Sequence, residues 1–468
     1  MSPTKVNENL TEGTTSREPD TTKPSFEYSD RFSLATRGRS YSRQFFSMYQ
    51  QRLNVLKPRV DKRAMEKWGN NTRRVDGQKI QWKEKILDIV GGELCWVSGT
   101  VFVEMKDKLD IFQDVEHGTD DVMPKPPANY LGNEGKVVML EDESGRAILH
   151  NEALLEYSRV VSGAIIAVLG IEIQAGIFEV MEILTPAMAP QKPLPMATDS
   201  EQYIAFVSGL KFQQETDCDL KTVLLQQWLC GELGGAEDVA LSSKVTRLII
   251  AGNSVEEIEE DTDKKEDFGS KNTSHFKSES LRLFNAWLSS VVASMPVTIM
   301  AGPKDPAEIC MPQQPLHRSL LGANARYVGT SASEPVYNTT NPAWMELENG
   351  LRILGSAGQN ISDILKYFQP EQGISPTDIM SKTLLWQHMA PTAPDTLYCY
   401  PYEDVDPFVL EETPHVYFAG NQGEFGSLKA DIDGTEVSVV SVPEFAETGQ
   451  LVLINTCTLE AKVVEFAV

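Results

Sequence analysis

Histidine and cysteine offer the easiest chemistry to recognise from spacing, and neither type is arranged as a metal site in this sequence. The six histidines are His117, His150, His275, His317, His388 and His415. No two of them stand four residues apart, the spacing that puts two imidazoles on one helix face, so we expect hydrogen-bonded structural roles. The six cysteines are Cys95, Cys218, Cys230, Cys310, Cys399 and Cys457. They contain no C-x-x-C pair, which argues against a structural zinc site.

Two further reactive motifs are missing from the sequence. The stretch from Gly329 to Ser333 is not the G-x-S-x-G turn of a serine hydrolase, because its fifth residue is serine. Nowhere does the chain read G-x-x-x-x-G-K-[ST], the loop that holds nucleotide phosphates. Neither a serine nucleophile nor a P-loop nucleotide site is therefore supported.

Composition narrows the class of protein further. The 468 residues are enough for two or three domains, and the formal net charge is -25. Proteins that grip the phosphates of nucleic acid usually carry excess lysine and arginine, so this acidity disfavours a stand-alone nucleic-acid binder, although a local basic patch stays compatible with it. No apolar run approaches the roughly 20 residues that span a bilayer. The polar N-terminus and scattered cysteines favour a reducing compartment.

The N-terminal part of the chain is expected to be a disordered tail followed by a helical segment. Residues 1–27 contain few large apolar side chains, which predicts disorder. Residues 28–92 carry helix signals: apolar residues recur at helical spacing from Phe45 to Leu56 and stop before Pro58. A second helix is expected through Trp82 and Leu87.

Residues 93–185 predict a small β-barrel of the OB type, because about five strands fit into this short range. Residues 94–103 have strand character, and residues 136–140 and 146–149 flank a turn, which predicts a hairpin. Two more strands are expected at 161–173 and 177–184. A generic β-sandwich fragment is the alternative.

The rest of the chain predicts a layered α/β domain at residues 196–468, after a proline-rich linker at 186–195. Short apolar strands are expected at 203–208, 247–251 and 297–300, with amphipathic helices at 220–233 and 278–294 between them. The end of the chain, from Val416, returns to strands. The acidic residues at 254–276 predict a mobile surface loop within this domain.

Several proline- and glycine-containing segments resemble the B-subunit family of eukaryotic DNA polymerases. They are Met300–Pro306, Met311–His317, Ala393–Leu397 with Tyr400–Pro401, and Pro414–Asn421. The resemblance runs from about Tyr41 to the C-terminus. Three features are similar to the delta type in particular: the sequence Met311-Pro312-Gln313-Gln314-Pro315-Leu316-His317, the tract Gly355–Ile364, and Ser42-Arg43-Gln44.

The resemblance implies an α+β / α/β fold class: an N-terminal helical segment and an OB-fold β-barrel, then a calcineurin-like phosphoesterase-type α/β sandwich that is inactive. Active phosphoesterases hold two metals with the motifs D-x-H, G-D, G-N-H-D and G-H-x-H. The matching stretches here are Gly209-Leu210-Lys211, Gly252-Asn253, Gly302-Pro303-Lys304-Asp305 and Gly420-Asn421-Gln422-Gly423. The resemblance thus marks Gly209, Lys211, Asn253, Pro303, Lys304, Asn421 and Gly423 as degenerate former metal-site positions, with no catalytic residue, metal or cofactor. Asp305 survives, and we expect it to cap a helix or a turn beside Pro306.

The resemblance also implies a function. It indicates a non-catalytic accessory subunit of replicative DNA polymerase delta, acting in the nucleus in DNA replication, repair and translesion synthesis. The implied role is bridging the C-terminal metal-binding module of the catalytic subunit and a third accessory subunit. The catalytic subunit of polymerase zeta is a further implied partner, DNA is contacted only indirectly, and no membrane is involved.

Two alternatives from other classes stay open. One is a single-stranded nucleic-acid binder that uses the OB barrel, with Trp96 and Phe102 as candidate stacking residues. The other is an active metallophosphoesterase, against which the missing ligands argue.

Overall fold

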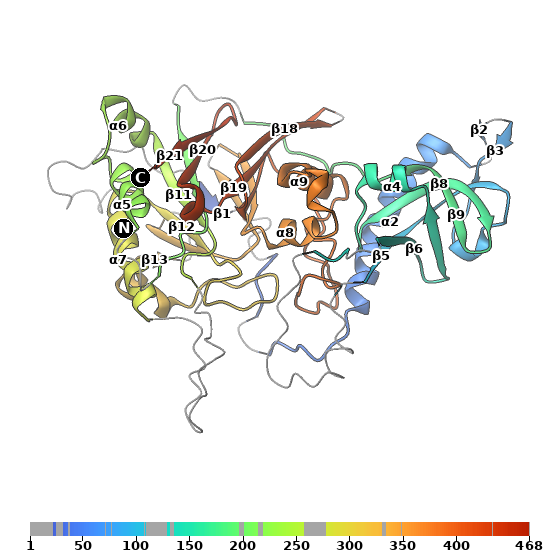
Figure 1. Cartoon of the computed structure of the whole chain (residues 1–468), viewed down its shortest axis with the longest axis horizontal. Helices are drawn as coiled ribbons and strands as arrows, with labels where there is room; N and C mark the ends of the chain where they lie inside the picture. The colour runs from blue at the N-terminus through green and yellow to red at the C-terminus, as the bar shows by residue number, and fades with distance from the viewer. Residues whose placement is uncertain are drawn as a thin grey trace. The chain divides into compact units, whose positions relative to one another are not determined.

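The chain forms two compact units. The structure is a computed structural model that describes residues 22–24, 31–35, 38–70, 72–75, 77–106, 108, 129–131, 135–195, 201–213, 219–256, 278–329, 334–347, 349–432 and 434–467. We call one unit the barrel unit; it comprises Ser40–Gln191 and Asn360–Thr413. The other, the sandwich unit, comprises Met1–Arg39, Lys192–Gln359 and Pro414–Val468. Figure 1 shows the elements coloured along the chain.

A closed five-stranded barrel is the centre of the barrel unit. Its strands are β5 (Leu94–Met105), β6 (Lys136–Glu141), β7 (Arg146–His150), β8 (Ile165–Gln174) and β9 (Ile177–Leu184). They pair in the order β5-β6-β7-β9-β8, and β8 pairs in turn with β5, which closes the barrel. Only the β7–β9 pair of this ring is parallel, and α4 (Glu152–Ser158) joins β7 to β8. This is the five-stranded OB barrel that the sequence predicts.

A long helix, α2 (Phe46–Trp68), packs against this barrel. Its residues Leu56, Val60, Ala64 and Trp68 recur every four residues and lie in one buried cluster with barrel residues such as Trp96. The prediction that the helix stops before Pro58 is wrong, because Pro58 lies inside it. A proline inside a helix costs about 3 kcal/mol, and the buried face on its C-terminal side offsets that cost.

The second helix expected through Trp82 and Leu87 is also wrong. The chain forms a short hairpin of β2 (Arg74–Val75) and β3 (Gln78–Lys79), then β4 (Gln81–Trp82), which pairs with β5, and a 3-10 turn, η1 (Ile86–Asp88). In this turn Ile86 is buried whereas Leu87 is 74% exposed. One buried side chain gives too little apolar contact to stabilise a longer helix.

Residues 360–413 complete the barrel unit, although the sequence-based range 196–468 assigns them to the α/β domain. They include most of α8 (Gln359–Leu365), η3 (Pro370–Gln372) and α9 (Pro376–Leu385). The compact units therefore divide the chain differently from the ranges that the sequence suggests.

The sandwich unit contains two sheets. The first has the order β1 (Thr22–Pro24), β15 (Ala343–Leu347), β16 (Arg352–Ser356), β17 (Val416–Gln422), β19 (Thr435–Pro443) and β18 (Gly426–Ile432). The second has the order β13 (Val328–Gly329), β14 (Val336–Thr339), β12 (Val297–Met300), β11 (Val245–Ala251), β10 (Tyr203–Val207), β20 (Gln450–Asn455) and β21 (Ala461–Glu465). These strands confirm the α/β pattern expected for this part of the chain.

Helices cover the second sheet on the face turned away from the first. They are α5 (Leu220–Leu229), α6 (Ala236–Ser243), α7 (Ser278–Ser294) and η2 (Arg318–Tyr327). In β10, Ala205 packs with Trp228 and Trp287 of the helices, whereas Phe206 packs in the other cluster, with Phe418 of the first sheet. Both faces of the strand are buried, which explains its continuous apolar sequence.

Two predicted segments of low order lie mostly outside the described residues. Of the tail at 1–27, only Thr22–Pro24 is described, and it pairs with β15. Of the acidic loop at 254–276, only Ser254 to Glu256 are described. Ser254 and Val255 are each 1% exposed, so a mobile loop is wrong for these two residues. His117, His275 and Cys218 also lie outside the described residues. Among the described helices, none combines the length and the apolar character needed to cross a bilayer.

A buried arginine connects α2 to residues 388–406 within the barrel unit. Arg52 is fully buried, and its Nε–H donates to the Asp406 carboxylate at 2.7 Å. Its two Nη groups donate to the carbonyl oxygens of Pro391 at 2.7 Å and Ala393 at 2.6 Å. The same Asp406 oxygen lies 2.8 Å from His388 Nε2. Burial raises the pKa of Asp406, but the charges of His388 and Arg52 outweigh it and hold this pKa well below its ordinary value.

The barrel itself adds one more acceptor to this network. Gly163, in the turn before β8, accepts a weaker bond from Arg52 Nη1 at 3.3 Å. Its φ is +82°, and a Cβ there would overlap the Pro391 carbonyl oxygen. Glycine is therefore required both for the backbone conformation and for the close approach.

Replacing Arg52 by alanine should destabilise the barrel unit by about 3–5 kcal/mol, because the buried Asp406 would lose one of its two partners and keep only His388. The matched control is Arg43→Ala, which breaks an exposed pair with Glu403 and should cost roughly 1 kcal/mol or less. Urea unfolding monitored by hydrogen exchange in α2 measures the stability change of both variants.

The lowered pKa of Asp406 stabilises the fold above about pH 4, and this contribution is lost as the pH falls further. The difference in unfolding free energy between wild type and Arg52→Ala should therefore shrink below that pH. If Arg52→Ala and Arg43→Ala lost the same unfolding free energy at neutral pH, the stabilising role given to the buried Arg52–Asp406 pair would be contradicted.

Candidate functional site

The parallel strands of the sandwich unit end at loops that meet one another, and we call these loops the strand-end cluster. β10, β11 and β12 are parallel neighbours in one sheet, and β16, β17 and β19 are parallel neighbours in the other. After β10, the Gly209 N–H donates to the Gly252 carbonyl at 2.9 Å, and the Ser208 carbonyl accepts from the Phe445 N–H at 2.8 Å. Reactive groups of α/β proteins usually lie at such strand ends, so the cluster is the candidate site.

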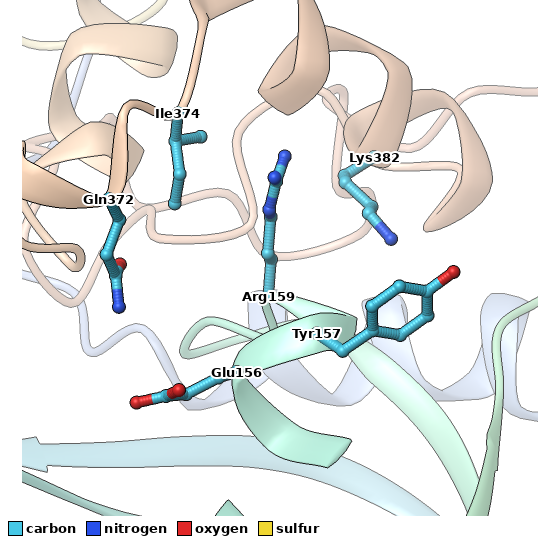
Figure 2. Close-up of a pocket in the computed structure, with 6 residues that line it drawn as sticks. All are labelled: Glu156, Tyr157, Arg159, Gln372, Ile374 and Lys382. Carbon is cyan, nitrogen blue, oxygen red and sulfur yellow. The ribbon is translucent and has the colours of Figure 1, made fainter. Parts of the chain in front are cut away.

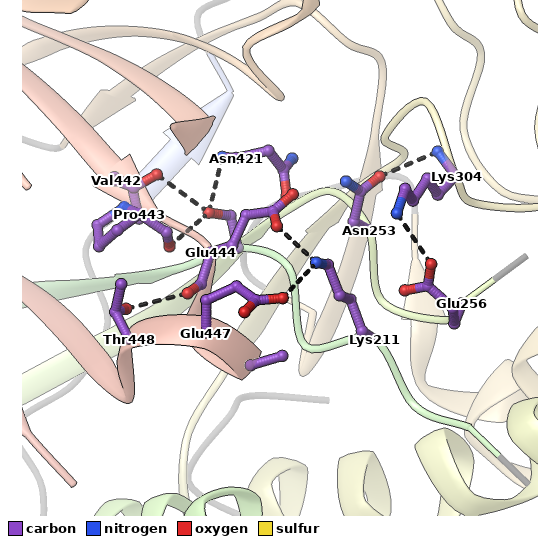
Figure 3. Close-up of polar contacts among 12 residues, drawn as sticks. Lys211, Asn253, Glu256, Lys304, Asn421, Val442, Pro443, Glu444, Glu447 and Thr448 are labelled. Atoms are coloured by element: carbon purple, nitrogen blue, oxygen red, sulfur yellow. Dashed lines mark hydrogen bonds and ion pairs between the residues drawn. The ribbon is translucent and has the colours of Figure 1, made fainter. Parts of the chain in front are cut away.

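Lys211 is the central charge of the strand-end cluster. Its ammonium lies 2.6 Å from Glu444 Oε2 and 3.1 Å from Glu447 Oε1, as Figure 3 shows. Its side chain is only 13% exposed. Burial lowers the pKa of Lys211, but its hydrogen bonds to both glutamates outweigh burial and raise the pKa above its ordinary value. One lysine cation thus pairs with two carboxylates that follow β19.

A second lysine is also neutralised by its own carboxylate. The Lys304 backbone N–H donates to Asn253 Oδ1 at 3.0 Å, and the Lys304 ammonium lies 2.8 Å from Glu256 Oε1 (Figure 3). Asn253 has a positive φ of 54°, a conformation that asparagine tolerates better than most residues. The amide oxygen of Asn253 therefore holds the loop after β12.

Asn421, at the end of β17, joins the two sheets. Its Nδ2 donates to the carbonyl oxygens of Ala251 at 3.0 Å and Ala357 at 2.8 Å, and its backbone N–H donates to Ser208 Oγ at 2.8 Å. Its Oδ1 is buried and has no hydrogen-bond partner among the described residues. Among the described positions that the resemblance marks as former metal-site positions, Asn421 thus has a buried amide oxygen that accepts no hydrogen bond.

Asp305 retains a carboxylate, but backbone groups occupy it. Its Oδ1 accepts from the N–H groups of Ser254 and Val255 at 2.7 and 3.2 Å, and its Oδ2 accepts from the Gly302 N–H at 2.8 Å. The prediction that Asp305 caps a turn is therefore confirmed, and the carboxylate also ties the loop after β11 to the loop after β12. Burial raises the pKa of Asp305 to about 6 against the opposing effect of these donors.

Close backbone contacts fill the middle of the strand-end cluster. A Cβ on Gly252 would lie 2.7 Å from the Ala357 Cβ and 2.8 Å from the Gly302 Cα. A Cβ on Gly302 would lie 2.5 Å from the Asn253 nitrogen. Such distances are shorter than side chains allow, so the two glycines let the loops pack directly on each other.

The donors in this cluster do not fit a pair of divalent metals. A two-metal site needs several carboxylates or imidazoles that converge on the ions. Here the carboxylates of Glu444, Glu447 and Glu256 face lysines, and Asp305 is held by backbone N–H groups. Among the described residues, no group of three or more His, Cys, Asp and Glu side chains is placed to hold a metal.

The structure brings together five of the seven positions marked by the resemblance: Gly209, Lys211, Asn253, Lys304 and Asn421. Pro303 and Gly423 are exposed instead, and a Cβ on Gly423 would touch nothing. Sequence reasoning missed Glu444 and Glu447. Their position directly after a strand, β19, is the signal that could have found them.

Two histidines, His317 and His415, lie in the segments that resemble the B-subunit family, and both are hydrogen-bonded. His415 Nδ1 accepts from the Arg352 N–H at 2.9 Å, and its Nε2 lies 2.9 Å from the Lys192 carbonyl. His317 Nδ1 accepts from the Ser319 N–H at 3.3 Å at the start of η2. Both rings therefore fix local backbone.

Comparison with known families gives two matches along the chain. The family described as DNA polymerase delta subunit OB-fold domain matches residues 44–183, which confirms the OB fold. The family of the B subunits of DNA polymerases alpha and epsilon matches residues 204–427.

Curated relatives match over most of their length. The DNA polymerase delta small subunit of Saccharomyces cerevisiae is 35% identical, over 93% of this chain and 92% of that protein. The DNA polymerase delta small subunit of Oryza sativa is 34% identical over 82% of this chain and 86% of that protein. DNA polymerase delta subunit 2 of Drosophila melanogaster is 33% identical over 92% of this chain and 95% of that protein. Among solved structures, an archaeal phosphodiesterase covers 57% of this chain at 11% identity, with a TM-score of 0.26, too low to carry an argument.

Replacing Lys211 by methionine should destabilise the sandwich unit by about 2 kcal/mol, since it removes charged hydrogen bonds and leaves Glu444 beside Glu447. The control Lys244→Met breaks an exposed pair with Glu201 and should change the stability much less, because solvent screens exposed charges. Because the folded-state pKa of Lys211 is raised, its stabilisation is complete below about pH 10 and is lost as the pH rises through that pKa. Denaturant unfolding at neutral pH and at about pH 11 should therefore show a smaller difference between wild type and Lys211→Met at the higher pH.

Proposed function

We propose a scaffolding role for this chain, which belongs to the family of DNA polymerase delta small subunits. In this role it is non-catalytic and bridges the C-terminal metal-binding module of the catalytic subunit and a third accessory subunit. It works in the nucleus, in DNA replication, repair and translesion synthesis, and it contacts DNA only through its partners. Polymerase zeta is a second complex that uses it.

The observation that carries this proposal is the charge arrangement in the strand-end cluster. Lys211 lies between Glu444 and Glu447, in the place where a hydrolase would need a metal cation. A lysine neutralises carboxylates but supplies neither an activated water nor a Lewis acid. The sandwich unit is therefore an inactive phosphoesterase-type domain whose fold serves binding.

The domain ranges form part of the same proposal. Residues 93–185 are the OB domain and residues 196–468 are the phosphoesterase-type domain in evolutionary origin. Residues 360–413 belong to the second range in sequence but to the barrel unit in packing.

Single-stranded nucleic-acid binding by the barrel is the weaker alternative. Trp96 is fully buried and its Nε1–H donates to the Gly69 carbonyl at 2.8 Å, so it cannot stack on a base. Lys108 and Arg146 lie 5.1 and 5.0 Å from the Phe102 ring centroid, but each is paired, with Asp395 and Glu141. A basic groove with free aromatic faces is what such binding needs.

The chain should form a stable complex with a polymerase delta catalytic subunit. Because large, partly apolar interfaces are little affected by screening, the complex should persist at about 0.5 M NaCl. Affinity capture of the purified subunits measures it, and a catalytic subunit without its C-terminal metal-binding module is the control that should not be captured. The chain alone should also capture the third accessory subunit, which tests the bridge. A catalytic subunit that fails to bind in low salt would refute the proposal.

The purified chain should show no metal-dependent phosphodiesterase activity. Hydrolysis of bis-p-nitrophenyl phosphate, measured with and without excess Mn²⁺, should stay at the rate of the metal solution alone, because the carboxylates are already paired. Manganese-dependent turnover that disappears in Asp305→Ala would show that the site is active.

A further inference from the structure

A pocket in the barrel unit has the charge and shape of a binding site for an acidic peptide. It lies between the end of α4 and the segment of η3 and α9, and its volume is about 330 Å³. Its lining residues are Glu156, Tyr157, Arg159, Gln372, Ile374 and Lys382. Figure 2 shows the Arg159 side chain reaching from the α4 side into the space between Ile374 and Lys382.

Local structure fixes the two cations of the pocket. Arg159 follows the last turn of α4 in the left-handed conformation, with φ of 53°, and its N–H donates to the Leu155 carbonyl at 3.0 Å. Its guanidinium is held 3.1 Å from Asp378 Oδ2. Lys382 lies one turn further along α9 from Asp378, and its ammonium is 5.8 Å from the Tyr157 ring centroid. Arg159 and Lys382 thus reach the same space from opposite walls.

Only one of the two cations has a carboxylate at ion-pair distance among the described residues. Within the described part of the chain, Asp378 is the only carboxylate at ion-pair distance from Arg159, and none lies that close to Lys382. Burial and the charge of Arg159 lower the pKa of Lys382, whereas Asp378 only partly opposes them. Two neighbouring cations with a single carboxylate at ion-pair distance are unusual in a chain whose net charge is -25. An anion placed between the two groups would relieve their repulsion.

The remaining walls favour a peptide over a nucleic acid. Tyr157 is 81% exposed and its ring lies beside the Lys382 ammonium (Figure 2), and Ile374 gives an apolar wall. Tyrosine and arginine are the residues that most often dominate the energy of protein interfaces. A phosphate backbone needs an extended row of cations, whereas this pocket has one pair and also contains Glu156.

We propose that this pocket binds a segment of a partner protein in which a glutamate or aspartate lies next to an aromatic or aliphatic residue. The carboxylate lies between Arg159 and Lys382, with the Arg159 fork donating to both of its oxygens. The apolar neighbour packs on Tyr157 and Ile374. The proposal goes beyond the scaffolding role, and it does not depend on which polymerase subunit supplies the segment.

Fluorescence anisotropy with the full chain tests this proposal. The probe is a labelled peptide Glu-Glu-Phe-Glu-Glu, and its lysine counterpart and a short oligothymidylate are the comparison ligands. Wild type should bind the acidic peptide, and Arg159→Gln or Lys382→Gln should each weaken it about tenfold, the loss expected for one charged hydrogen bond. Tyr157→Ala should weaken it as well. Arg282→Gln, at an exposed arginine of α7 paired with Glu279, is the matched control and should bind as wild type does.

Three outcomes would overturn the proposal. They are no binding of the acidic peptide, equal binding by the pocket variants and wild type, and tighter binding of oligothymidylate through the same residues, which would make the site a nucleic-acid contact. Tyr157 is so exposed that Tyr157→Ala should fold normally, which keeps the test valid if a charge variant unfolds. The same variants are also tested for capture of the catalytic subunit, so that failure of the pocket is distinguished from failure of the scaffolding role.

Discussion

The barrel unit depends on one fully buried ion pair, between Arg52 and Asp406. Burying charge is costly unless every donor and acceptor is used, and here the guanidinium uses the Asp406 carboxylate and the carbonyl oxygens of Pro391 and Ala393. These acceptors come from residues 391–406, far along the chain, whereas Arg52 comes from the helix before the barrel. The pair therefore connects residues 391–406 to α2 within the barrel unit.

The sandwich unit uses lysine for a similar purpose. Carboxylates at the ends of parallel strands need a cation, and in this chain Lys211 and Lys304 supply it from within. The two ammonium groups hold the loops together by binding the carboxylates of Glu444, Glu447 and Glu256, which are then not available as metal ligands. This explains how the strand-end loops keep their packing while, among the described residues, the ligand set for two metals is missing.

Features set by local pattern could be predicted from the sequence, and features set by distant contacts could not. The hairpin of β6 and β7 follows from its turn chemistry, and the buried strand β10 follows from its continuous apolar sequence. The family resemblance is confirmed by the curated relatives. The continuation of α2 through Pro58 depends on its burial against the barrel, which no local signal shows. Likewise, the sequence marks Lys211 as an unsuitable metal ligand, but its partners Glu444 and Glu447 lie far along the chain.

The placement of cations in so acidic a chain carries information about binding. A lysine or arginine that already has its carboxylates, such as Lys211, stabilises the fold and has little charge left for a ligand. Arg159 and Lys382 differ, since only Arg159 has a carboxylate at ion-pair distance, Asp378, and both cations line an open pocket beside an exposed tyrosine. Charge that the fold does not neutralise is charge available to a partner. The strand-end cluster and the pocket therefore differ in how far their cations are paired within the fold, and this difference is the reason for placing the proposed peptide site on the barrel unit.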